Sequence, residues 1–294
     1  MFGAHINKYH AAQNASSVAH IEAARKHALD SNNFIYGAAA IFISNPRGYN
    51  ITITDAEVTE IREYITKTNI KIIAHSSYCA NSSWKGNEMA AACIKKELDI
   101  CKKAGIIGLV VHLPKAPVST VMAQIEKIFD PTNKDVKIYL ETPAVTPKET
   151  YYETPKKISH LFSEIRKVDP NLDHFGLCID SAHLWVNGID LQSYESANSW
   201  LTELEQYRDI LPMGNVMIHL NDSANPIGVG PDTHAALTFG KIWEKYQSKI
   251  KESGIAAIVD FAIRNNTPTI LERSPKESLN SDYKVLKSLL PLVP

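Results

Sequence analysis

Short apolar runs recur along the whole chain, and most of them end in a polar or charged residue. Because their apolarity is nearly continuous rather than alternating, they are typical of parallel strands covered on both faces. These runs predict eight strands, over residues 2–6, 36–44, 70–76, 108–113, 137–143, 175–183, 215–222 and 267–274.

The intervals between the runs carry apolar residues at helical spacing. The clearest patterns predict helices over 16–31, 55–68, 87–105 and 118–129, with Asp55 and Ser119 as N-caps and Gly105 at a C-cap. Eight right-handed βα units close into a barrel more readily than they form a doubly wound sheet. A dinucleotide-binding sheet would need a glycine-rich turn after an early strand, and "GVGP" at 228–231 follows a late one. We therefore expect an α/β protein in which residues 1–294 form a single (β/α)8 TIM barrel.

Composition narrows the class of protein. Lys and Arg total 31 against 32 Asp and Glu, so a general nucleic-acid-coating role is disfavoured, although a local basic cleft is compatible with this balance. The four cysteines form no CxxC pair, which disfavours a thiolate zinc site and favours a reducing compartment. The first residues lack the apolar stretch of a signal peptide, and no apolar run has the length of a membrane span. We expect a soluble intracellular monomer with no membrane partner.

The strand ends carry the candidate chemistry. In a barrel, the carboxyl ends of all strands face the same mouth, and the predicted strands and the loop after 222 bring there five histidines and four carboxylates: His75, His112, Glu141, Asp180, His183, His219, Asp232, His234 and Glu272. Taken singly, each histidine is better explained as a buried imidazole with one hydrogen bond, and each carboxylate as half of an ion pair. Few Lys or Arg residues lie at these ends, and Arg273 should point away from its neighbour Glu272.

Clustered carboxylates without cationic partners need protons or metal ions. Mixed histidine and carboxylate ligands suit Zn²⁺, Mn²⁺ or Fe²⁺, and nine ligands exceed the coordination of one ion, so two or three ions are expected. Such a site generates hydroxide near neutral pH and stabilises both oxygens of a displacement at phosphorus, which predicts phosphodiester hydrolysis. Metal-assisted sugar isomerisation at a barrel mouth is the alternative.

The segments "AHSSY", "VVHL", "YLETP", "GLCIDSAHLWVNGIDL", "MIHLNDS", "GPDTHAAL" and "ILER" together resemble the endonuclease IV family of apurinic/apyrimidinic (AP) endonucleases, also called AP endonuclease family 2. They occur in that family's order and span nearly the whole chain. The length and the compact loops resemble the forms carried by large DNA viruses.

This resemblance implies three zinc ions, with Mn²⁺ as an alternative at one or more positions. The first would be held by His75 and His112, with Glu141 bridging to a second ion that Asp180, His219 and Glu272 complete; the third would be held by His183, Asp232 and His234. The implied reaction is hydrolysis of the phosphodiester 5′ to an abasic site in duplex DNA, which leaves a 3′-hydroxyl, together with trimming of blocked 3′ ends. Glu141 or Glu272 would orient the attacking hydroxide.

The resemblance also implies residues that contact DNA. Arg47, Tyr78 and Cys79 match positions that fill the gap left by the flipped nucleotide, and Cys79 stands where the family more often has a larger apolar residue. Tyr78 is equally well explained as a rim-packing residue, and Arg47 could be a plain surface charge. His5 matches a family histidine beside the site, for a phosphate or for contact with a metal ligand. Thr233 and Ala235 replace a common Arg and His, which weakens the expected phosphate contacts of that loop.

Two alternatives remain open. A metal-dependent sugar isomerase or epimerase of the xylose isomerase-like barrel group would use one or two metals and a catalytic Lys or Glu pair, and the additional ligands in "PDTH" argue against it. A non-catalytic DNA-binding relic is disfavoured because all nine candidate ligands are intact.

Overall fold

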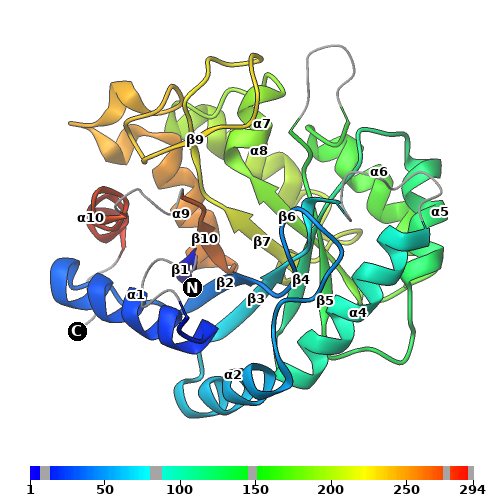
Figure 1. Cartoon of the computed structure of the whole chain (residues 1–294). Helices are drawn as coiled ribbons and strands as arrows, with labels where there is room; N and C mark the ends of the chain where they lie inside the picture. Colours follow the sequence, from blue (N-terminus) through cyan, green and yellow to red (C-terminus); the bar gives the residue numbers. More distant parts are fainter. Residues whose placement is uncertain (7–13, 80–87, 145–150, 274–278, 291–294) are drawn as a thin grey trace.

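The computed structural model describes residues 1–6, 14–79, 88–144, 151–273 and 279–290. In these ranges, eight parallel strands close into a barrel in the order β1-β2-β3-β4-β5-β6-β7-β10, with β10 paired back to β1 (Figure 1). The strands are β1 Phe2–His5, β2 Ala38–Phe42, β3 Lys71–His75, β4 Gly108–His112, β5 Lys137–Glu141, β6 Phe175–Asp180, β7 Val216–His219 and β10 Thr269–Leu271. The predicted (β/α)8 barrel is confirmed.

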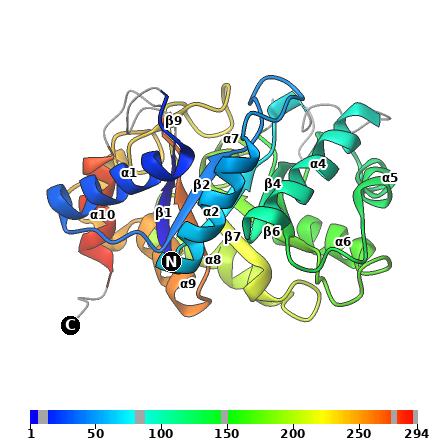
Figure 2. The same cartoon turned by 60° about the horizontal axis from the view of Figure 1, so that its bottom comes forward.

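Helices surround the barrel, and α1 packs against both α2 and α10 (Figures 1 and 2). The helices are α1 Ser17–Asn32, α2 Asp55–Thr68, α4 Glu88–Ala104, α5 Val118–Ile128, α6 Pro155–Ile165, α7 Ser181–Val186, α8 Tyr194–Glu205, α9 Gly254–Arg264 and α10 Asn280–Leu289. Among the described residues, 3-10 turns span Met213–Asn215, Glu244–Tyr246 and Ile250–Glu252, and a small hairpin joins β8 Asp222–Ser223 to β9 His234–Ala235. Over the described ranges, no helix combines the length and apolarity that crossing a membrane requires.

Both predicted N-caps are wrong. Helix α2 is capped by Thr54, whose hydroxyl accepts the Glu57 N–H while the Glu57 carboxylate accepts the Thr54 N–H. This reciprocal capping box satisfies two helix-end donors, which Asp55 alone could not do. Helix α5 begins one residue before Ser119, with Pro117 in the cap position. Gly105, directly after α4, has φ of +74°, as a C-cap glycine should.

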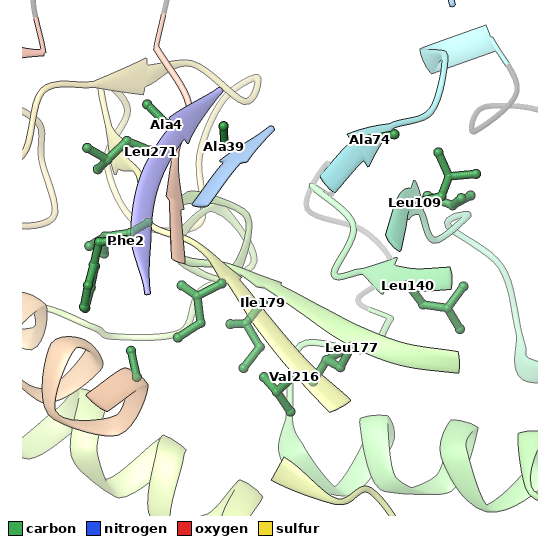
Figure 3. Close-up of a cluster of buried hydrophobic side chains, with 14 of the residues drawn as sticks. Phe2, Ala4, Ala39, Ala74, Leu109, Leu140, Leu177, Ile179, Val216 and Leu271 are labelled. Atoms are coloured by element: carbon green, nitrogen blue, oxygen red, sulfur yellow. The ribbon is translucent and has the colours of Figure 1, made fainter. Parts of the chain in front are cut away.

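The strands sort their side chains between two apolar clusters. Outward-facing strand residues, including Ala74, Leu140, Ile179 and Leu271, belong to the large cluster between barrel and helices (Figure 3). Their neighbours inside the barrel form a separate cluster of Ala38, Ala40, Ile73, Val110, Tyr139, Cys178, Met217 and Ile270. Because side chains alternate along a strand, the next inward positions after this inner cluster lie at the carboxyl-end mouth.

Candidate metal centre at the barrel mouth

Six of the nine predicted ligands occupy those next inward positions. Each follows a member of the inner cluster by two residues: His75, His112, Glu141, Asp180, His219 and Glu272. The strand register also aligns His112 with Glu141, and Asp180 with His219. The hydrogen-bond ladder of the barrel therefore brings together residues that are far apart in the sequence.

The first group consists of His75, His112 and Glu141. The two Nε2 atoms are 3.3 Å apart, and Glu141 Oε2 lies 3.5 Å from that of His75 and 2.8 Å from that of His112. His75 Nδ1 donates to the Ser76 carbonyl at 2.8 Å. Since a carbonyl oxygen only accepts, Nδ1 carries the proton and the Nε2 lone pair faces the group, as in a metal-binding histidine.

The second group surrounds His219, whose Nδ1 lies 2.8 Å from Glu141 Oε1, 3.2 Å from Glu272 Oε2 and 3.9 Å from Asp180 Oδ2. Glu141 thus directs one oxygen to each group, which is the geometry of a bridging carboxylate. The ligand atoms of Glu141, Asp180, His219 and Glu272 all lie within 4.8 Å of one another, as do those of the first group.

The third group draws on a helix and a loop. His183 lies in the first turn of α7, which Asp180 caps by accepting its N–H at 2.9 Å. Asp232 places one oxygen 3.1 Å from His183 Nε2 and the other 3.1 Å from His234 Nε2. The Nδ1 atoms of His183 and His234 donate to the carbonyls of Thr142 and Glu272. Both Nε2 atoms therefore face a carboxylate and require a second proton or a cation between them.

The electrostatics of the mouth lead to the same requirement. Burial alone lowers the pKa of His183, but Asp180 and Asp232 outweigh it and hold this pKa well above its usual range. Burial likewise opposes protonation of His234, yet the hydrogen bond to Asp232 raises its pKa to about 9. Burial would raise the pKa of Glu141, but the neighbouring histidines keep it well below its usual range.

Throughout the described ranges, the ion pairs of the four carboxylates are with histidines. Arg273 instead reaches Asp282 of α10 at 3.4 Å, as its expected direction away from Glu272 requires. A divalent cation can take the place of the protons that hold this cluster together, and the donor set of imidazole nitrogens and carboxylate oxygens fits Zn²⁺ or Mn²⁺.

The predicted DNA-contact residues lie at the rim. Tyr78 is 46% exposed, and its ring stands edge-on to His75 at 5.6 Å and to His112 at 5.7 Å. Arg47 lies on the loop after β2, and Cys79 is half-buried. The Tyr78 N–H donates to the Pro46 carbonyl at 2.9 Å, so the two loops that carry these residues are joined.

His5 has a different environment. It is only 6% exposed, its Nδ1 lies 3.3 Å from Glu272 Oε1, and its ring packs on Phe42 with centroids 4.6 Å apart. Of the two roles expected for His5, this placement favours contact with a candidate ligand over contact with a phosphate.

Sequence reasoning missed Asn221. This fully buried residue donates from Nδ2 to Asp180 Oδ2 at 2.7 Å, and its Oδ1 accepts the Glu272 N–H at 2.8 Å. It therefore connects two candidate ligands from separate strands. The signal was present in the sequence, because an amide follows His219 by two residues, beyond the strand end.

Comparisons with known proteins agree with this architecture. A family profile described as a xylose isomerase-like TIM barrel matches residues 35–289. The chain is 37% identical over 263 residues to a protein named probable AP endonuclease from African swine fever virus (isolate Pig/Kenya/KEN-50/1950), covering 87% of this chain and 88% of that protein. A crystal structure described as AsfvAP:AG aligns with a TM-score of 0.90 at 34% identity, covering 99% of each chain. Endonuclease IV from Thermus thermophilus aligns with a TM-score of 0.71 at 20% identity, over 98% of this chain and 97% of that one, which shows a shared fold.

Proposed function

Since this chain belongs to the xylose isomerase-like TIM barrel family, and within it to the AP endonucleases, we propose that it is a zinc-dependent enzyme that cleaves abasic DNA. Its substrate is the phosphodiester 5′ to an abasic site in duplex DNA, and its product carries a 3′-hydroxyl. The observation that best supports this is the Glu141 carboxylate, which has one oxygen 2.8 Å from His112 and the other 2.8 Å from His219. A bridging carboxylate of this kind is expected in a polynuclear hydrolase.

The nine candidate ligands would hold three ions in the groups described above. Bound there, divalent ions supply Lewis acidity and make water acidic enough to act as a nucleophile near neutral pH. Glu141 and Glu272 both approach His219 Nδ1, so either carboxylate can orient the attacking water. His5 and Asn221 hold Glu272 by its side chain and its backbone N–H, which fixes the direction of that carboxylate. Trimming of blocked 3′ ends would use the same groups, because it breaks the same kind of bond.

The rim residues would recognise the lesion. Tyr78 lies beside His75 and His112, and Tyr78 and Cys79 would enter the space left by the missing base, while Arg47 would contact the DNA backbone. Flipping a nucleotide costs a few kcal/mol, and least where the base is absent, so the abasic site would be selected partly by its ease of deformation. Phosphate contacts would make binding fall steeply with added salt.

The test combines metal analysis with a cleavage assay. Purified, undialysed protein is analysed for transition metals and then incubated with a duplex that contains one abasic site, beside an intact duplex of the same sequence. We expect about three ions per chain, a cut 5′ to the abasic site and no cut in the intact duplex. Absence of stoichiometric metal, or isomerisation of a sugar without any cleavage of DNA, would overturn the proposal.

A further inference from the structure

Asp222 is a fully buried carboxylate that takes no part in the three ligand groups. Its Oδ1 accepts the N–H groups of Ser223 at 2.8 Å and Ile242 at 3.0 Å, and its Oδ2 accepts those of Thr238 at 3.0 Å and Gly240 at 3.2 Å. No ion pair within the described part of the chain includes Asp222. Four backbone dipoles therefore compensate its charge. Both oxygens are fully hydrogen-bonded only when the backbone adopts this one arrangement.

The hydrogen bonds from these four N–H groups to Asp222 close a loop, residues 224–241, that carries two candidate ligands. The loop leaves β8 at Ser223 and returns through β9, where Asp222 pairs with Ala235, and Ser223 with His234. The Ala224 N–H also donates to the Thr233 carbonyl at 2.8 Å. Asp232 and His234 thus lie on the returning arm of the loop, residues 232–235. The segment that Asp222 binds, residues 238–242, follows this arm in the chain. That segment has a second anchor, because Asp282 Oδ1 accepts the Leu237 N–H at 2.6 Å.

The bound segment is strained and tightly fitted. Thr238 has φ of +70°, a conformation that β-branched residues rarely adopt, and it persists only where neighbouring groups hold it. Its N–H is held by Asp222, and its carbonyl accepts from Gln247 Nε2 at 2.8 Å. A Cβ at Gly240 would lie 2.4 Å from Asp222 Oδ1 and 2.5 Å from the Ser223 carbonyl, so the close approach of the segment to Asp222 requires glycine.

We propose that Asp222 is a positioning residue for the third ion: it holds the returning arm so that Asp232 and His234 meet His183. The inference rests on the proposed function, because it assumes that this group binds an ion. Strand-end ligands are fixed by hydrogen bonds to strands on both sides, whereas Asp232 and His234 depend on the two-residue β8–β9 pairing and on the side chains that hold the loop around it. Without Asp222, binding of the third ion would have to order this arm and would be weakened by the lost conformational entropy.

The test is Asp222→Asn, in which an amide NH₂ replaces one carboxylate oxygen. Because the NH₂ group only donates, it cannot accept hydrogen bonds from the backbone N–H groups that it faces. We expect metal analysis to show loss of one ion out of three, with the other two retained. We also expect faster hydrogen exchange across 232–242 in metal-stripped variant than in metal-stripped wild type, a readout that involves neither activity nor metal. Asp169→Asn is the matched control: Asp169 is also buried and accepts two backbone N–H groups, from Asp173 at 3.2 Å and His174 at 2.9 Å, but it lies before the start of β6. This control should keep all three ions.

Gly240→Ala displaces the same carboxylate without removing it, and it decides the question if Asp222→Asn does not fold. Selective loss of one ion in either folded variant supports the inference. Three ions and unchanged exchange in a folded variant overturn it while the proposed function stands, and unfolding of both variants overturns a role confined to this loop. Wild-type protein that neither binds ions nor cuts abasic DNA overturns the proposed function instead, and the exchange of metal-stripped protein then still reports whether Asp222 orders the arm.

Discussion

The mouth of the barrel contains ligands placed in two different ways. Glu141, Asp180 and His219 sit at strand ends with side chains that are 0% exposed, and the strand-end side chain of His112 is 25% exposed. Asp232 sits on the loop between β8 and β9, and His234 begins the two-residue strand β9; their side chains are 31% and 17% exposed. The strand ends inherit their positions from the closed barrel, while we infer that the loop ligands depend on Asp222. The comparison teaches that one candidate metal centre can combine a part that the fold fixes with a part that individual side chains must order.

The largest effect is expected from Glu141→Gln, which changes the strand-end part. The amide keeps the shape but removes the charge shared by the first two groups, so cleavage should fall by at least about 100- to 1,000-fold, as when a single charge-stabilising group is lost. Single-turnover cleavage of an abasic duplex measures this, and circular dichroism checks the fold. Glu126→Gln, on the exposed face of α5, is the control. Full activity of the Glu141 variant would show that this carboxylate does not bridge.

Removal of metal should separate the two parts. With increasing chelator we expect one ion to leave early, from the group in which Asp232 and His234 lie on the β8–β9 hairpin rather than at a barrel strand end, and the other two to resist mild EDTA. A chromogenic zinc indicator follows the release over time. A single phase for all ions would mean that loop and strand-end ligands hold metal equally well, and rapid loss of every ion would contradict a deeply buried centre.

Glu97→Gln tests whether the rim depends on a similar device. Glu97 of α4 is fully buried and accepts from the hydroxyls of Ser44 and Ser76 and from the Ser77 N–H, so it joins the ends of β2 and β3. An amide leaves at least one of these donors unpaired, which costs about 1–3 kcal/mol of unfolding free energy. We expect a lower urea midpoint and a raised KM with kcat little changed, because the loops of Arg47 and Tyr78 follow these strands. A fall in kcat alone would contradict this role.

The smallest effect is expected from Cys79→Leu. If Cys79 enters the gap at the lesion, a larger apolar side chain should bury more surface and tighten binding by about 1 kcal/mol, or about fivefold. Fluorescence anisotropy with a labelled abasic duplex measures this, with the intact duplex as the control. Equal affinity of the two proteins for the abasic duplex would place Cys79 outside the contact.

The sequence by itself determined the barrel and the residues at its mouth. Continuous apolar runs specify buried parallel strands, and a histidine or carboxylate two residues beyond an inward-facing residue must reach the mouth, because side chains alternate along a strand. The structure accordingly brings all nine candidate ligands together. The N-caps of α2 and α5 were less predictable, because neighbouring residues compete for a cap and only the local hydrogen bonds select one.

Only the tertiary structure decided how these residues are shared. Three arrangements depend on side-chain directions from separate strands. Glu141 directs one oxygen to each of two groups, Asn221 links Asp180 to Glu272, and His5 is directed toward Glu272. The hydrogen bonds that Asp222 accepts from Thr238, Gly240 and Ile242 form only when the loop folds back on the residues where it begins. A sequence pattern fixes which way a strand residue points, but contacts between distant segments form only when the whole barrel has closed around them.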